Sequence, residues 1–164
     1  MSVPNGPDLP DLLLMPGEGK RLVVSPGGTE IVFKARGERP AAAFAFMEWM
    51  IEPNWPGPVP HVHRRHEELV YVLDGELTFL VGDEVVIARP RTFLRLPPGL
   101  KHAFSNHPDG SSHLIMVVSP PDFEGYFDSA ADLAARVRRG EITDRAQVLA
   151  IQRQIRARFE TDEV

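Results

Sequence analysis

The chain of 164 residues is long enough for one domain with a full hydrophobic core, and its 43% hydrophobic and 25% charged residues are close to globular averages. With a net charge of −5 it offers no basic surface for nucleic acid or an anionic membrane. It has no cysteine, which excludes disulfides and thiolate chemistry, so any metal must be bound through nitrogen and oxygen.

Residues 1–20 carry four prolines and three glycines, which predicts an irregular N-terminal arm. The apolar run at residues 12–15 is far too short to span a bilayer. It has no basic segment before it and no small-residue cleavage site after it, so we expect no signal peptide and a cytoplasmic protein. We expect this run to dock on a neighbouring surface.

Residues 21–120 are expected to form an all-β domain, because short apolar segments alternate with Gly and Pro and show no helical period. The predicted strands are residues 21–24, 30–34, 43–51, 69–73, 77–81, 84–88, 92–96 and 114–118. Asp74-Gly75 and Gly82-Asp83 are both typical of hairpin turns. Many short strands at regular spacing favour a sandwich or a barrel.

Residues 121–164 are expected to form a helical extension that packs on the barrel. Asp122 is the predicted N-cap of a first helix, which ends at Gly140. Thr143 or Asp144 is the predicted N-cap of a second helix, with Gln147 in capping-box spacing. Apolar residues recur at intervals of three and four in both helices, so each must bury one face on the barrel, on the other helix or on a second subunit.

The histidines suggest a metal site within the β domain. His61 and His63 are two residues apart, so on a strand both rings point the same way. Four polar residues then bend the chain, so that Glu68 begins the next strand on the face of Val70. His102 follows the Pro98-Gly99 turn and supplies a fourth candidate ligand.

These residues resemble the two sequence motifs of the cupin superfamily. The first motif has the form H-x-H, three or four residues, Glu, six residues and Gly, and it is matched by His61, His63, Glu68 and Gly75. The second has the form P-x-G, two residues, His, three residues and Asn, and it is matched by Pro97, Gly99, His102 and Asn106. Two glycines differ from the family pattern: Gly57 lies nearer to His61 than expected, and Arg91 occupies the position six before Pro97.

The resemblance implies a cupin-type double-stranded β-helix, a jelly-roll barrel, with one divalent transition metal per chain bound by His61, His63, Glu68 and His102. Such a set leaves two of six coordination positions open, as catalysis requires. It does not decide between Fe, Mn, Co, Ni and Zn. The two helices after residue 120 are similar to those of small single-domain cupins described as quercetinase-like, and the resemblance also implies a homodimer.

Three functions are compatible with this reading. The first is a dioxygenase that acts on an enolisable or phenolic aromatic small molecule, with Glu68 as both metal ligand and catalytic base. The second is a non-redox cyclase, isomerase or lyase on a polyketide or sugar, with the metal as Lewis acid. The third is a binding cupin without chemistry, although the chain lacks the helix-turn-helix domain typical of sensors.

Several side chains near the motifs have roles that the sequence does not decide. We expect His66 and Glu67 to be exposed turn residues rather than further ligands or proton carriers. Arg91 and Arg95 would reach an anionic substrate only if they faced inward, and at strand edges we expect them in solvent. Phe93 and Phe104 are expected to provide apolar cover for the site.

Overall fold

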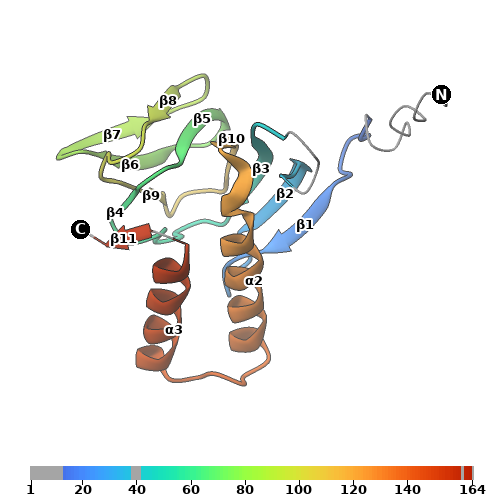
Figure 1. Ribbon diagram of the computed structural model, residues 1–164, viewed down its shortest axis with the longest axis vertical. Helices are drawn as coiled ribbons and strands as arrows, with labels where there is room; N and C mark the ends of the chain where they lie inside the picture. The colour runs from blue at the N-terminus through green and yellow to red at the C-terminus, as the bar shows by residue number, and fades with distance from the viewer. Residues whose placement is uncertain (1–12, 38–41, 160, 164) are drawn as a thin grey trace, which may run out of the picture.

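The computed structural model describes residues 13–37, 42–159 and 161–163, and within them the chain is mostly β-structure with two long helices near its C-terminal end (Figure 1). All strand pairs are antiparallel. One sheet has the order β1 (Lys20–Val23), β2 (Glu30–Ala35), β3 (Ala45–Ile51), β10 (Ser112–Ser119), β5 (Glu67–Asp74) and β8 (Phe93–Leu96). The other has the order β11 (Thr161–Glu163), β4 (His61–His63), β9 (His102–Asn106), β6 (Leu77–Val81) and β7 (Glu84–Ala88). This arrangement confirms the expected double-stranded β-helix.

The core lies between the two sheets, because alternate side chains of each central strand point inward. In β3 every second residue is buried, among them Met47 and Trp49. Phe79 of the facing sheet is fully buried and stacks on Phe104, with ring centroids 5.3 Å apart. Each predicted strand is present, with ends that differ by up to two residues, whereas β9 and β11 were not predicted.

The two predicted hairpins have different outcomes. Gly82-Asp83 joins β6 to β7 in a tight hairpin, as expected. Asp74-Gly75 also forms a turn, but β5 and β6 belong to different sheets, so the hairpin prediction is wrong there. The turn lies directly against β10, since a Cβ on Gly75 would approach the Cα of Ser112 to 2.7 Å. Local turn chemistry does not decide which strands pair.

The first helical segment begins as a 3-10 turn, η1 (Pro121–Phe123), and continues as α2 (Glu124–Arg138). Asp122 does not cap α2, contrary to the prediction; its carboxylate binds His66 and Arg65 of the β domain instead. The side chain of Arg36 also holds α2, with 2.9 Å bonds to Glu124 and Asp128. Gly140 follows the end of α2 with a φ of 73°, which agrees with its predicted role.

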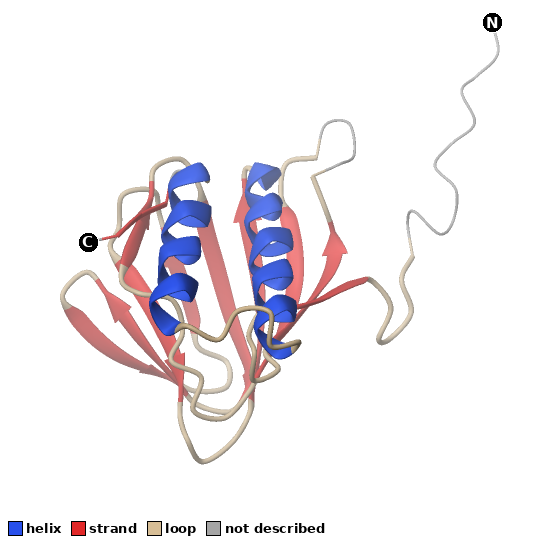
Figure 2. Ribbon diagram, turned by 90° about the horizontal axis from the view of Figure 1, so that it is seen from below, coloured by secondary structure: helices blue, strands red, loops and turns tan. Residues whose placement is uncertain are grey.

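The second helix, α3 (Arg145–Arg158), has Asp144 as its N-cap, and the Asp144 carboxylate accepts a 3.0 Å bond from the backbone of Ala146. The helix packs on α2 and on β11, the edge strand of the second sheet. Both helices lie side by side across one end of the β domain (Figure 2). The chain then returns to the domain, where Thr161 of β11 is paired with His63 of β4. None of the described helices has the length and apolar character needed to cross a membrane.

Two glycines with left-handed backbones allow a matched test of close packing. Gly57 has a φ of 71°, and an added Cβ would lie 1.6 Å from the carbonyl oxygen of Phe104. Gly82 has a φ of 63° and has no atom within 4 Å of the same position. We expect Gly82→Ala to lower the free energy of unfolding by about 1–2 kcal/mol through backbone strain alone. Gly57→Ala should lower it by at least about 2 kcal/mol more, because a backbone oxygen cannot move aside.

Urea unfolding of the two variants measures this difference. Equal stabilities would show that the segment around Gly57 moves freely away from β9.

Candidate metal centre

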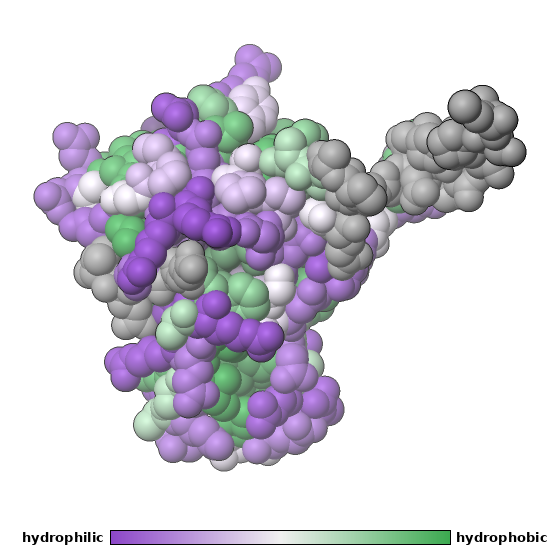
Figure 3. Space-filling view, viewed as in Figure 1, coloured by the Kyte–Doolittle hydropathy of each residue, from purple (hydrophilic) through white to green (hydrophobic). Residues whose placement is uncertain are grey.

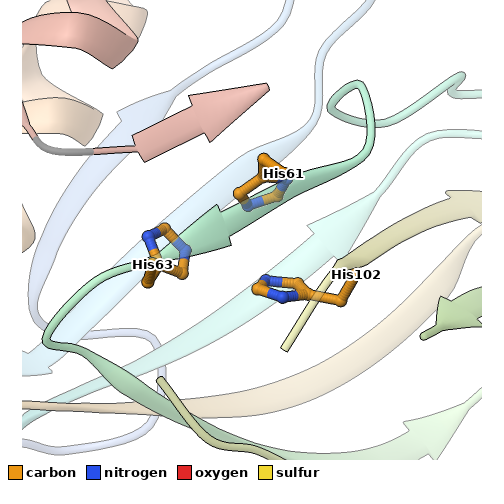
Figure 4. Close-up of side chains that lie close together, drawn as sticks. All are labelled: His61, His63 and His102. Atoms are coloured by element: carbon orange, nitrogen blue, oxygen red, sulfur yellow. The ribbon is translucent and has the colours of Figure 1, made fainter. Parts of the chain in front are cut away.

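Three imidazoles from two adjacent strands converge inside the barrel (Figure 4). His61 and His63 are the alternate, inward residues of β4, and His61 is paired in register with His102 of β9. One nitrogen from each ring lies within 4.8 Å of the others, and all three side chains are buried. The structure therefore brings together three of the four predicted ligands on one sheet.

Glu68 reaches the same cluster from the opposite sheet. It is the first buried residue of β5, on the inward face that it shares with Val70, as predicted. Its Oε1 lies 3.1 Å from Nε2 of His63, and its Oε2 lies 3.6 Å from Nε2 of His102. All four predicted ligands are thus adjacent.

The backbone fixes the orientation of two of the rings. Nδ1 of His61 lies 2.8 Å from the carbonyl oxygen of Val59, and Nδ1 of His102 lies 2.9 Å from that of Leu100. A neutral imidazole that donates from Nδ1 to a carbonyl keeps an unprotonated Nε2. This second hydrogen bond is characteristic of metal-binding histidines, because it sets both the tautomer and the ring orientation.

The charges of the cluster are strongly coupled. Burial and, next to it, the neighbouring His102 lower the pKa of His61 to about 4, so this ring is neutral near pH 7. Burial raises the pKa of Glu68, but hydrogen bonds from His102 and His63 outweigh it and hold that pKa well below its usual range. Burial lowers the pKa of His102, but Glu68 outweighs it and raises that pKa above its ordinary value. The site combines an ionised carboxylate with imidazole nitrogens.

This donor set fits a divalent transition metal. Imidazole nitrogen and carboxylate oxygen suit Fe, Mn, Co, Ni and Zn, whereas a site without sulfur does not select soft ions. His61, His63, His102 and Glu68 would hold the ion.

A cavity of about 520 Å³ opens beside the cluster and includes His61, His63 and Glu68 in its wall. Its β side is aromatic: the ring of Phe104 lies 5.7 Å from that of Trp49 and 5.3 Å from that of Trp55. Its other side is formed by apolar residues of α2 and α3. Hydrophobic surface is visible between the two helices in the lower part of the molecule (Figure 3). A cavity of this size and character suits a largely apolar small molecule.

The expectations about five neighbouring residues can now be judged. His66 is buried rather than exposed, and its Nε2 lies 2.6 Å from the Asp122 carboxylate, so that expectation is wrong. Glu67 is not an exposed turn residue either, because it is half buried at the start of β5. It forms an ion pair with Arg95, which is exposed as expected. Phe93 is 60% exposed on the outside of the barrel and covers nothing, whereas Phe104 lines the cavity as expected.

Arg91 explains how the chain tolerates the missing family glycine. It is exposed, and its φ of 76° is in the left-handed region that glycine adopts most readily. The backbone here therefore has a glycine-like conformation with an arginine, and Arg91 is not among the residues that line the cavity.

Sequence patterns did not indicate that residues of the helical extension, among them Phe123, Tyr126 and Arg156, line the cavity. The ring centroid of Phe123 lies 4.7 Å from that of His63, and the ring of Tyr126 stacks on Phe123 at 4.9 Å. The apolar spacing of α2 was interpreted as a packing face, which is the same signal that a cavity wall produces.

Comparison with known proteins agrees with this geometry. Residues 47–118 match the family model of the cupin domain. Over these residues the chain is similar to cupin domains. Its fold is also that of solved cupin structures, while no protein with a curated description matches the sequence.

Three solved structures resemble this chain with TM-scores of 0.56. KdgF from Halomonas sp. is 20% identical, over 65% of this chain and 90% of that protein. The polyketide cyclase RemF from Streptomyces resistomycificus is 24% identical, over 66% and 81%. A sugar phosphate isomerase from a cupin superfamily of Silicibacter pomeroyi is 18% identical, over 65% and 74%.

We expect His63→Ala and His102→Ala each to abolish stoichiometric metal binding, because each removes one of the four converging donors. Metal content measured by plasma mass spectrometry after loading and desalting tests this, and far-UV circular dichroism should remain typical of β-structure. His107→Ala is the control, since His107 is exposed outside the site beside Asp109. Full metal occupancy in both site variants would overturn the assignment.

Proposed function

We propose that this cupin is a metal-dependent dioxygenase that acts on an enolisable or phenolic aromatic small molecule. The observation that carries the proposal is the position of Glu68: a buried, ionised carboxylate among three imidazoles, in the wall of an aromatic cavity. Four donors leave room in a six-coordinate site for a substrate oxygen and dioxygen.

In this proposal, different residues of the chain bind the metal ion, accept a proton and orient the substrate. His61, His63 and His102 would hold the ion, and backbone carbonyls orient the rings of His61 and His102. A bound ion supplies Lewis acidity toward a substrate oxygen and, when redox-active, a route for electrons to dioxygen. Glu68 would accept the proton of the substrate hydroxyl, since its carboxylate borders the cavity. The aromatic side chains orient the substrate and exclude water from the deprotonated form.

The second candidate is a non-redox enzyme that uses the same residues with the ion only as Lewis acid. Two proteins of similar fold are named a polyketide cyclase and a sugar phosphate isomerase. Within this alternative, the aromatic walls favour a polyketide over a sugar. The third candidate, ligand binding without chemistry, would use the same cavity.

Oxygen consumption separates the first two candidates. The apo-protein is loaded separately with Fe, Mn, Co, Ni and Zn, and flavonols and other enolisable aromatics are screened in an oxygen electrode. We expect consumption with a redox-active ion and none with zinc. Turnover that is equally fast with zinc and without oxygen would contradict a dioxygenase and support a cyclase, isomerase or lyase.

Glu68→Gln tests the base. The amide keeps the size and one oxygen donor of the side chain but cannot accept a proton, so part of the metal should remain bound. With a substrate identified by the oxygen screen, we expect turnover to fall roughly 10²–10⁴-fold, as is typical of positioned general bases. Turnover within tenfold of the wild type at equal metal content would rule out this role for Glu68.

We also propose that the protein is a homodimer. Leu13 and Met15 are 52% and 56% exposed, and Phe93 of β8 is paired with the exposed Tyr71 of β5 on the outer face of the sheet. Exposed apolar residues next to an edge strand are typical of a surface that another chain covers. Light scattering at micromolar concentration should give twice the chain mass of 18.3 kDa, and a monomer mass would contradict the proposal.

A further inference from the structure

The cavity contains a buried cation, Arg156. Four charged residues other than histidine line it within the described part of the chain: Glu52, Glu68, Arg145 and Arg156. Glu52 accepts a 2.5 Å bond from the hydroxyl of Ser25, and Glu68 belongs to the metal cluster. Arg145 is exposed at the start of α3, whereas Arg156, in its last turn, is only 6% exposed.

Arg156 interacts with Tyr126 across the gap between α3 and α2. Burial raises the pKa of Tyr126, while the positive charge and a hydrogen bond of Arg156 act in the opposite direction, and the charge of Glu68 raises that pKa further. The phenol therefore lies within the electrostatic reach of both Arg156 and Glu68. Its ring is held in place by stacking on Phe123, which contacts His63.

We propose that Arg156 and Tyr126 together bind an acidic oxygen, such as a carboxylate, sulfonate or phenolate, on an aromatic ligand in the cavity. Guanidinium N–H groups and a phenol O–H are donors suited to an oxyanion, and a buried site with few competing waters strengthens the attraction. Aromatic rings on the β side hold the apolar part of the ligand. The inference rests on the proposed function only in taking this cavity as the substrate site, and it adds that the substrate is an anion.

Two related dyes test this without metal or turnover. 8-Anilinonaphthalene-1-sulfonate and N-phenyl-1-naphthylamine share one ring system, but only the first has a sulfonate, and both fluoresce in apolar surroundings. The affinity of each is measured by fluorescence titration of chelator-treated, desalted protein. Variants are Arg156→Gln, the rescue Arg156→Lys, Tyr126→Phe, and the control Arg153→Gln, which removes a charge from an exposed position of α3 outside the cavity.

We expect Arg156→Gln to weaken binding of the sulfonate dye about tenfold or more, and Tyr126→Phe about threefold or more. Arg156→Lys should recover part of the loss. Binding of the neutral dye should change less than about twofold in every variant, and Arg153→Gln should match the wild type. Circular dichroism and thermal unfolding check that each variant is folded, and Tyr126→Phe keeps the test valid if Arg156→Gln does not fold.

Three results would overturn the proposal: unchanged sulfonate binding in folded variants, an equal loss of both dyes, or a wild-type protein that binds only the neutral dye. An equal loss would mean that Arg156 and Tyr126 merely shape the cavity. Because the dyes need neither metal nor oxygen, failure of the dioxygenase proposal would leave the dye result unaffected. Failure of the dye experiment would likewise leave the dioxygenase proposal unaffected.

Discussion

The contact on which the site depends is the one between Glu68 and two histidines of the opposite sheet. A carboxylate buried inside a barrel is unstable unless charged or hydrogen-bonding partners compensate for the lost water. His63 and His102 provide these partners from β4 and β9, while Glu68 comes from β5, so this polar contact joins the two sheets inside the barrel. The same compensation would come from a divalent cation, which explains how a cluster of this kind is tolerated in the core.

The helical extension is tied at both ends to the segment of residues 61–66, which includes two of the proposed metal ligands. At its start, Asp122 binds Arg65 and His66. At its end, β11 is paired with β4, and Arg64 forms bonds of 2.7 and 3.1 Å with Asp162. The helices therefore form a wall of the cavity that is positioned by the metal-binding strand itself. A change in that strand would be transmitted to Phe123 and Tyr126, and thus to the substrate side of the cavity.

Local patterns in the sequence predicted most of the barrel and the four ligands. Short apolar segments bounded by turn residues predicted strands such as β6 and β7. The two histidines of β4 share a face because side chains on a strand alternate with a period of two residues. The missed features depend on contacts between distant segments. β11 has only three residues and exists through its pairing with β4, and Asp122 binds His66 although its position in the sequence is typical of a helix cap. Arg156 lies in a helix whose charged residues are otherwise mostly exposed, so no local signal marked it as part of a cavity.

The central claim is that His61, His63, Glu68 and His102 bind one metal ion, and anomalous X-ray diffraction from crystals of cobalt-loaded protein tests it most directly. We expect a single strong peak in the anomalous difference map inside the barrel. It should lie about 2.0–2.2 Å from three imidazole nitrogens and a Glu68 oxygen, the distances typical of similar zinc ligands. A cobalt-loaded crystal with no peak among these four residues, or with its ion bound instead at exposed histidines such as His107, would contradict it.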